Sequence, residues 1–367
     1  MAGEVTEGAH AQDAATEAAF ADLRRLLPAL LATLDALAYL ARRLHPPEFA
    51  EALAVVGEPD AELATLRPAL ELWPQRLAAV ASALATTSDA ALEGFAEIRA
   101  AGDLRGVFRA LRKLPRALES LYPLAAVMPP VSRFFLEPDA RTNTVLVGGL
   151  ERAGSPPEAG VLHGGGEPGA RGGFSAYVPE TYAADRDWPL VMALHGGSGN
   201  GRAFLWSWLA TARGRGAIVV APTAVGDTWA LMGEDGDTPN LAAILALVRD
   251  RWRIDPKRIL LTGMSDGGTF TLVSGLESGS PFTHLAPVAA AFHPILAQMA
   301  DADRIRGLPI HLTHGALDWM FPVEGAREAE AALSAAGARV TYREIADLSH
   351  CYPREMNAAI LDWLTAS

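Results

Sequence analysis

Glycines stand two residues before and two residues after a serine in Gly263-Met264-Ser265-Asp266-Gly267. The apolar run ILLTG leads into this pattern and a helical pattern follows it, so Ser265 is predicted to lie on a sharp strand-to-helix turn. Such a turn lifts the hydroxyl above the sheet edge, and a side chain at either glycine would collide with the turn. Ser265 is therefore a candidate nucleophile, and the backbone N–H of Asp266 is a candidate donor to an oxyanion.

A serine nucleophile needs a base to take its proton and a carboxylate to orient that base. His350 lies in DLSHCYP, on a predicted loop between the last strand and the last helix, and is the candidate base. Asp318 lies three residues after Gly315, just past the end of another predicted strand, and is the candidate carboxylate. Asp347, three residues before His350, is the competing carboxylate.

The tripeptide His-Gly-Gly occurs twice, at 163–165 and at 195–197. The second copy follows the buried-strand run PLVMAL, whereas the first follows the turn-rich stretch ERAGSPPEAG. A strand that ends in HGG can hold a backbone donor in place, so the backbone N–H of Gly197 is the predicted second oxyanion donor, with those of Gly196 and Ser198 as alternatives. The glycines of the first copy are predicted to belong to a linker.

The pattern of apolar residues changes near the middle of the chain. From about 13 to 128, apolar residues recur every three or four positions, which predicts a bundle of four or five helices. Ser88 and Asp103 are predicted N-caps at breaks in this pattern. Residues 1–136 are thus predicted to form an all-α domain, followed by a Gly/Pro-rich linker over 137–171 with one short strand at Thr144 to Val147.

After residue 172, short runs rich in Val, Ile and Leu alternate with helical patterns. This alternation predicts an α/β domain over 172–367, with a mainly parallel sheet flanked by helices. The predicted strands are FSAYV, PLVMAL, AIVVAP, ILLTG, APVAAA, PIHLT and RVTYREI, and the predicted helices span 202–213, 238–252, 267–276, 326–336 and 354–364.

Composition and charge narrow the function classes. The net charge is −12 at pH 7, and nucleic-acid binding needs clustered Lys and Arg, so no nucleic acid is expected as a partner. Cys351 is the only cysteine, and no apolar run with a basic flank opens the chain, so we expect a cytoplasmic protein. The apolar run 26–44 contains Pro28 and Asp35, which favours a buried amphipathic helix over a membrane span.

Four segments, ALHGGSGNG, RWRIDPKRILLTGMSDGG, HGALDWMFPV and DLSHCYP, together resemble the α/β-hydrolase superfamily. They are most similar to its phospholipase/carboxylesterase group, with kinship to polyhydroxyalkanoate depolymerase and feruloyl esterase type enzymes. The resemblance covers about 172–367 and nothing in 1–140. It implies an α/β-hydrolase fold, no metal or organic cofactor, and a site made of the nucleophile Ser265, the acid Asp318, the base His350 and the backbone donors of Gly197 and Asp266.

These predictions together indicate a serine carboxylesterase that cleaves uncharged esters with short or medium acyl chains through an acyl-enzyme on Ser265. The alternatives are a thioesterase or peptidase with the same triad, and a non-catalytic hydrolase-like scaffold that binds a partner. Trp229 and Trp319 flank predicted loops at the strand ends and are candidate pocket contacts. The helical domain is expected to act as a lid or as a module for homo-oligomerisation or partner docking, and the sequence leaves these roles open.

Overall fold

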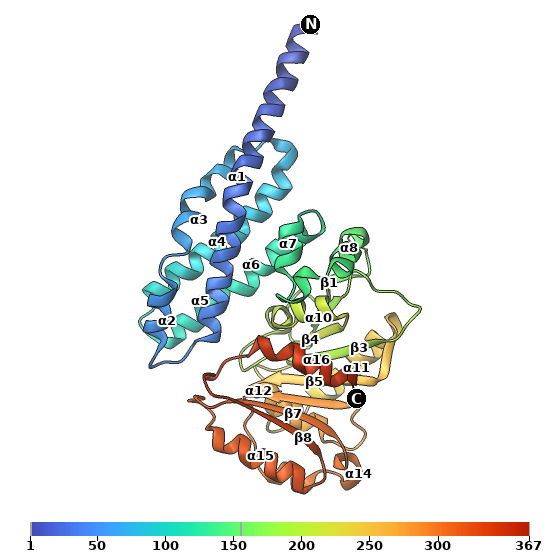
Figure 1. The fold of residues 1–367 in the computed structure, drawn as a ribbon. Helices are drawn as coiled ribbons and strands as arrows, with labels where there is room; N and C mark the ends of the chain where they lie inside the picture. The colour runs from blue at the N-terminus through green and yellow to red at the C-terminus, as the bar shows by residue number, and fades with distance from the viewer. Residues whose placement is uncertain (1, 155, 367) are drawn as a thin grey trace. The chain divides into compact units, whose positions relative to one another are not determined.

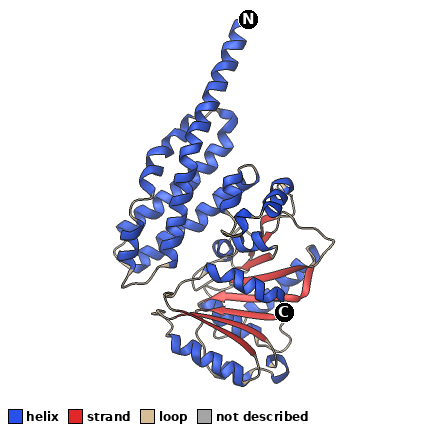
Figure 2. Ribbon diagram, viewed as in Figure 1, coloured by secondary structure: helices blue, strands red, loops and turns tan. Residues whose placement is uncertain are grey.

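The computed structural model describes residues 2–154 and 156–366 (Figures 1 and 2). The chain divides into two compact units, Met1–Phe134 and Phe135–Ser367. Every element in the described part of the first unit is helical. Its α-helices are α1 (Ala2–Arg42), α2 (Phe49–Val56), α3 (Asp60–Leu66), α4 (Ala78–Ala100), α5 (Leu104–Leu111), α6 (Lys113–Leu121) and α7 (Pro129–Phe134). These are more than the four or five predicted, because proline-containing turns divide the chain between α2 and α4 into short pieces.

The long helix α1 buries one stripe of leucines. The stripe consists of Leu26, Leu30, Leu34, Leu37 and Leu40, all fully buried. Their spacing of three and four residues places them on one face of the helix, which packs against α3 and α4. The amphipathic helix predicted over 26–44 is therefore confirmed. Of the helices in the described residues, none combines the length and the apolarity needed to cross a membrane.

One of the two predicted N-caps is correct. The Asp103 carboxylate accepts a hydrogen bond from the Gly106 backbone N–H at 2.8 Å and begins α5. The prediction for Ser88 is wrong, because Ser88 lies fully buried inside α4. The apolar face of α4 continues through Ala91 and Phe95, and its packing against α6 outweighs the preference of serine for a helix end.

The second unit is organised around one sheet of eight strands in the described residues, in the order β1-β2-β4-β3-β5-β6-β7-β8. β1 and β2, and β2 and β4, pair antiparallel, and all other neighbours pair parallel. The strands are β1 (Gly160–Gly164), β2 (Phe174–Val178), β3 (Trp188–Leu194), β4 (Ile218–Pro222), β5 (Ile254–Met264), β6 (His284–Val288), β7 (Pro309–Gly315) and β8 (Arg339–Ile345). The predicted mainly parallel sheet is confirmed.

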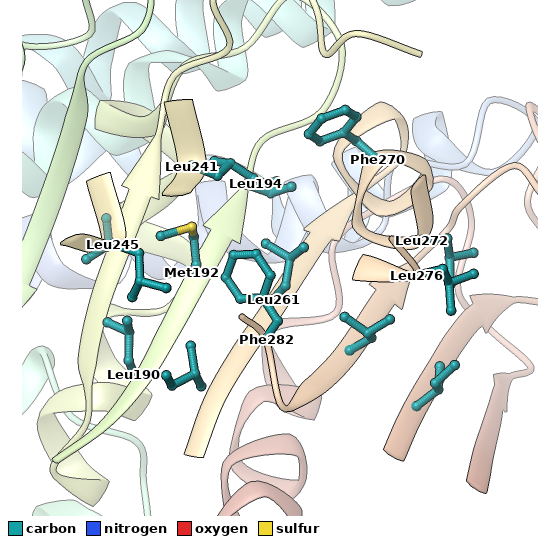
Figure 3. Close-up of a cluster of buried hydrophobic side chains, with 14 of the residues drawn as sticks. Leu190, Met192, Leu194, Leu241, Leu245, Leu261, Phe270, Leu272, Leu276 and Phe282 are labelled. Carbon is teal, nitrogen blue, oxygen red and sulfur yellow. The ribbon is translucent and has the colours of Figure 1, made fainter. Parts of the chain in front are cut away.

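Helices cover both faces of this sheet. Leu190, Met192 and Leu194 alternate along β3 and pack with Leu241 and Leu245 of α11 in a cluster that also takes in α12 and α15 (Figure 3). The opposite face carries α16, because its Trp363 ring contacts His284 of β6 while the next residue, Leu285, belongs to the first cluster. The helix α10 contacts α16. The helices of this unit are α8 (Thr144–Ala153), α9 (Gly201–Phe204), α10 (Leu209–Arg215), α11 (Asp237–Arg251), α12 (Asp266–Gly275), α13 (Ile295–Met299), α14 (Ala302–Ile305), α15 (Val323–Ala335) and α16 (Asn357–Ala366).

The segment predicted as a linker carries ordered elements. The short strand expected at Thr144 to Val147 is wrong, because the Asn143 side chain accepts a hydrogen bond from Leu146 N at 3.1 Å and begins helix α8. The first HGG, at 163–165, lies at the end of β1, where a Cβ on Gly165 would stand 2.8 Å from the Gly173 Cα. Its glycines therefore allow a tight β1–β2 connection at the sheet edge, where we expected a flexible linker.

A buried histidine lies on the α16 face of the sheet, at the start of β6. His284 is 4 % exposed, and its ring meets the Trp363 ring edge-on with centroids 4.9 Å apart. Burial, aided by the charge of Arg339, lowers the pKa of His284 from its ordinary 6.5 to about 4. Between those two pH values the unfolded chain binds a proton that the folded chain does not, so acidification destabilises the fold.

We predict that His284→Gln makes the second unit less sensitive to acid. Lowering the pH from 7 to 5 should cost the wild type about 2 kcal/mol more of its free energy of unfolding than it costs the variant. Urea unfolding followed by tryptophan fluorescence measures this, because seven of the eight tryptophans lie in the second unit. Between pH 7 and 8 the two proteins should change in parallel, and an equal loss between pH 7 and 5 would contradict the assignment.

Candidate active site

Ser265 occupies a strained turn between β5 and α12. Its φ is 57° and its ψ is −120°, a conformation that L-residues rarely adopt. A Cβ on Gly263 would lie 2.3 Å from the Gly267 carbonyl oxygen, and a Cβ on Gly267 would lie 2.4 Å from that of His195. Both glycines are therefore required, for the steric reason that the sequence pattern indicates.

The structure brings Asp318 and His350 together with Ser265, although 85 residues separate Ser265 from His350. His350 Nε2 lies 2.9 Å from Ser265 Oγ, and His350 Nδ1 lies 2.8 Å from Asp318 Oδ2. Asp318 stands on the turn after β7, and His350 on the loop between β8 and α16. All three residues are buried, with Ser265 retaining 8 % of its surface. Of the two carboxylates considered from the sequence, Asp318 is the one bonded to the imidazole Nδ1.

The Asp318 carboxylate is held ionised by hydrogen bonds. Burial by itself would raise its pKa, but bonds from His314, His350 and the Phe321 backbone N–H outweigh burial and hold the pKa well below the usual range. Oδ1 accepts from the backbone N–H groups of Met320 at 2.9 Å and Phe321 at 2.8 Å. The Phe321 ring also meets the His350 ring edge-on, with centroids 5.1 Å apart.

The second HGG lies directly against the turn at Ser265. A Cβ on Gly196 would stand 3.6 Å from the Ser265 Cβ, and a Cβ on Gly197 would stand 2.7 Å from Asp266 Oδ2. The Thr228 hydroxyl donates to that same Asp266 oxygen at 2.6 Å. The first HGG lies on β1, which β2, β4 and β3 separate from β5. Only the copy at 195–197 thus borders the serine.

His195 fixes the second HGG loop as a neutral imidazole. Its Nε2 accepts a hydrogen bond from the Ala224 N–H at 3.1 Å, so Nδ1 carries the proton and donates to the Gly196 carbonyl at 2.7 Å. Burial is the main cause that lowers its pKa to about 4. An uncharged ring with both nitrogens occupied therefore sets the path of the loop beside Ser265.

The two tryptophans predicted to line a pocket lie in different surroundings. Trp229 is 2 % exposed, stacks on Phe270 and donates its indole N–H to the His195 carbonyl at 2.7 Å. It differs from the prediction, because this packing makes it part of the core under the HGG loop. Trp319 follows Asp318 and is 45 % exposed, so its contact with a substrate stays a prediction.

The structure adds two contacts at the site that the sequence does not predict. His314 lies 3.3 Å from Asp318 Oδ2, and Thr228 bonds to Asp266. The HG dipeptide four residues before Asp318 was the available signal for His314, whereas no local pattern marks Thr228. Within residues 2–154 and 156–366, no three His, Cys, Asp or Glu side chains are grouped so as to hold a metal ion.

Part of the chain matches a known protein family. A family model described as phospholipase/carboxylesterase matches residues 238–367, from α11 to the end of the chain. The bifunctional acetylxylan esterase/xylanase XynS20E of Neocallimastix patriciarum is 29 % identical over 157 residues, which is 41 % of this chain. The match spans 22 % of that relative, about a fifth of its length.

Several solved structures are similar to part of this chain. A thermostable esterase matches with a TM-score of 0.44 and 22 % identity, over 53 % of this chain and 58 % of the other. Esterase PE8 matches with a TM-score of 0.42 and 19 % identity, over 52 % of this chain and 96 % of the other. A truncated carbohydrate esterase from gut microbiota matches with a TM-score of 0.47 and 14 % identity, over 57 % of this chain and 96 % of the other.

The matched residues 238–367 run from α11 through β5, the turn at Ser265 and the loops that carry Asp318 and His350. The sheet that contains them is mostly parallel and covered by helices on both faces, as the family resemblance of the sequence implies. The second unit thus has the α/β-hydrolase fold, its residues 238–367 match the phospholipase/carboxylesterase family, and the protein is a hydrolase.

Proposed function

We propose that this hydrolase is a serine carboxylesterase that cleaves small carboxylic esters through an acyl-enzyme on Ser265. The observation that supports this most directly is the continuous line of hydrogen-bond distances from Ser265 Oγ to His350 Nε2, at 2.9 Å, and from His350 Nδ1 to Asp318 Oδ2, at 2.8 Å. Serine hydrolases use the same hydrogen-bonded arrangement, in which the base lies between the nucleophile and the orienting carboxylate.

The first half-reaction uses His350 as the general base. Ser265 Oγ attacks the ester carbonyl carbon while His350 Nε2 takes the hydroxyl proton. The Asp318 carboxylate accepts the Nδ1–H bond, which keeps the imidazole in the required tautomer and stabilises its charged form. His350 then gives the proton to the leaving alkoxide, and the acyl group stays on Ser265.

The second half-reaction restores the enzyme. A water molecule takes the place of the alcohol, and His350 removes its proton as it attacks the acyl carbonyl. Collapse of this second tetrahedral intermediate releases the carboxylic acid, and the proton returns to Ser265 Oγ. The same base therefore serves both steps, so loss of the Ser265 hydroxyl stops the cycle before any acyl group is transferred.

In both steps negative charge develops on the carbonyl oxygen of the substrate. We assign its stabilisation to the backbone N–H groups of Gly197 and Asp266. The closeness of the Gly197 backbone to Asp266, and the position of Asp266 at the start of α12, support this assignment.

We predict that Ser265→Ala lowers kcat for p-nitrophenyl acetate and p-nitrophenyl butyrate by about 10⁴-fold or more, because the covalent step needs the hydroxyl. A fluorophosphonate probe should label the wild type once, at Ser265 as located by mass spectrometry, and should not label the variant. Ser280→Ala is the matched control, since the Ser280 hydroxyl is buried without a hydrogen-bond partner in the described chain and lies beyond the far end of α12. Wild-type turnover by Ser265→Ala would refute the proposed mechanism.

A second prediction tests the oxyanion assignment. Gly197→Ala should lower kcat/KM by about 10- to 100-fold, because the new methyl group would meet the Asp266 carboxylate and displace the backbone N–H. Thr228 holds that carboxylate in place, so the side chain cannot simply turn away. Steady-state kinetics on p-nitrophenyl butyrate measures the loss.

The double variant Gly197→Ala/Asp266→Ala provides the control. Removal of the Asp266 carboxylate makes room for the methyl group, so Gly197→Ala should cost less in the Asp266→Ala background than in the wild type. Equal costs in the two backgrounds would mean that the clash is not the cause of the loss.

A further inference from the structure

A second histidine, which the proposed mechanism does not use, contacts the Asp318 carboxylate. His314 Nε2 lies 3.3 Å from Asp318 Oδ2, the same oxygen that faces His350. His314 stands one residue before the end of β7, and its side chain is 1 % exposed. The two imidazoles therefore approach one carboxylate oxygen from two different elements, β7 and the loop before α16.

The proton on His314 can be assigned from its neighbours. Nε2 lies 2.9 Å from the Phe321 carbonyl oxygen, which can only accept a hydrogen bond. Nε2 must therefore carry a proton, and this N–H donates to the Phe321 carbonyl while the same nitrogen lies 3.3 Å from Asp318 Oδ2. The Phe321 backbone N–H donates to Asp318 Oδ1, so one residue ties His314 to both oxygens of the carboxylate.

Together, these neighbours surround both oxygens of the Asp318 carboxylate. An ionised carboxylate has about four acceptor positions. On Asp318, backbone N–H groups of Met320 and Phe321 donate to Oδ1, the His350 imidazole donates to Oδ2, and His314 Nε2 lies 3.3 Å from Oδ2. With donors on both oxygens, the carboxylate cannot turn about its χ2 angle without breaking bonds on each side.

The second ring nitrogen of His314 makes this residue costly to folding. Its other nitrogen, Nδ1, is buried and has no hydrogen-bond partner among the described residues. A buried polar atom without a partner is destabilising, and an apolar side chain of similar size would avoid that penalty. The contact with Asp318 gives a functional reason for a histidine at this position.

We propose that His314 is a positioning residue, which holds the Asp318 carboxylate so that Oδ2 stays aligned with His350 Nδ1. This inference rests on the proposed function, in which Asp318 orients the base. Without the His314 N–H, Oδ2 keeps only the His350 imidazole beside it, so the bonds to Oδ1 alone resist a shift of Oδ2 out of line with His350 Nδ1.

The test compares three substitutions that differ in what they can donate. His314→Leu removes the donor. His314→Gln places an amide N–H at about the reach of Nε2, and His314→Asn is one methylene too short for that contact. We expect kcat to fall about tenfold in the Leu and Asn variants with KM within about twofold of the wild type, and we expect the Gln variant to recover most of the rate.

Rates should be expressed per active site, with sites counted by fluorophosphonate titration. A merely structural role would reduce the number of titrated sites and leave the rate at each site unchanged. His311→Leu is the matched control: the same substitution three residues away on β7, where the side chain contacts Trp363 and not Asp318. Its rate per site should equal that of the wild type.

The possible results separate the two proposals. If Ser265→Ala keeps wild-type activity, the proposed function fails whatever His314 does. If Ser265→Ala is inactive while His314→Leu and His314→Asn keep the wild-type rate per site, the positioning role alone is overturned. Loss of rate in the Gln variant equal to that in the Asn variant would also overturn it. Should His314→Leu fail to fold, the two carboxamide variants still decide, because they differ only in reach.

Discussion

Close backbone packing around the turn at Ser265 is the constraint on which the candidate site depends. Gly267 lies so near the Leu194 and His195 carbonyls, and Gly263 so near the Gly267 carbonyl, that a methyl group at either glycine would overlap a backbone atom. The turn after β5 is thereby pressed against the loop after β3. The positive φ of Ser265 is tolerated because these contacts leave no other path for the chain. One steric fit therefore fixes the hydroxyl and the HGG backbone relative to each other.

The rest of the site is fixed by hydrogen bonds that are sheltered from water. Asp318 has donors on both oxygens, and His195 uses both ring nitrogens on backbone groups. Buried polar groups of this kind are costly when unpaired and rigid when paired, so a filled network holds each side chain in one orientation. Catalysis by a serine needs such fixed geometry, because proton transfer between the hydroxyl and the imidazole tolerates little displacement.

The sheet explains why distant segments can share one site. β5, β6, β7 and β8 run parallel, so the loops after them emerge at the same edge, where Ser265, Asp318 and His350 are found. The other HGG lies at the end of the edge strand β1, and β2, β4 and β3 separate it from β5 along the sheet. The same tripeptide therefore has a different role in each place, set by the strand that precedes it.

The sequence alone predicts those features that depend on residues close together in the chain. Short apolar runs that alternate with helical patterns predict the strands from β2 to β8, since strands buried on both faces need unbroken runs of residues such as Val, Ile and Leu. The glycines around Ser265 predict its turn, since no larger residue fits. Ser265, Asp318 and His350 each follow a predicted parallel strand, and the loops after parallel strands open on the same sheet edge. Their positions in the sequence therefore predict that they meet.

Tertiary packing decided the rest. Ser88 lies within α4 because burial of a long apolar face outweighs a local capping preference. Asn143 begins a helix where Val-rich composition favoured a strand, and Trp229 fills the core under His195 because its ring and its N–H both find partners there. The contact of His314 with Asp318 depends on the shape of the turn through Phe321. Spacing along a chain cannot specify such contacts, because they arise only when separate elements meet in space.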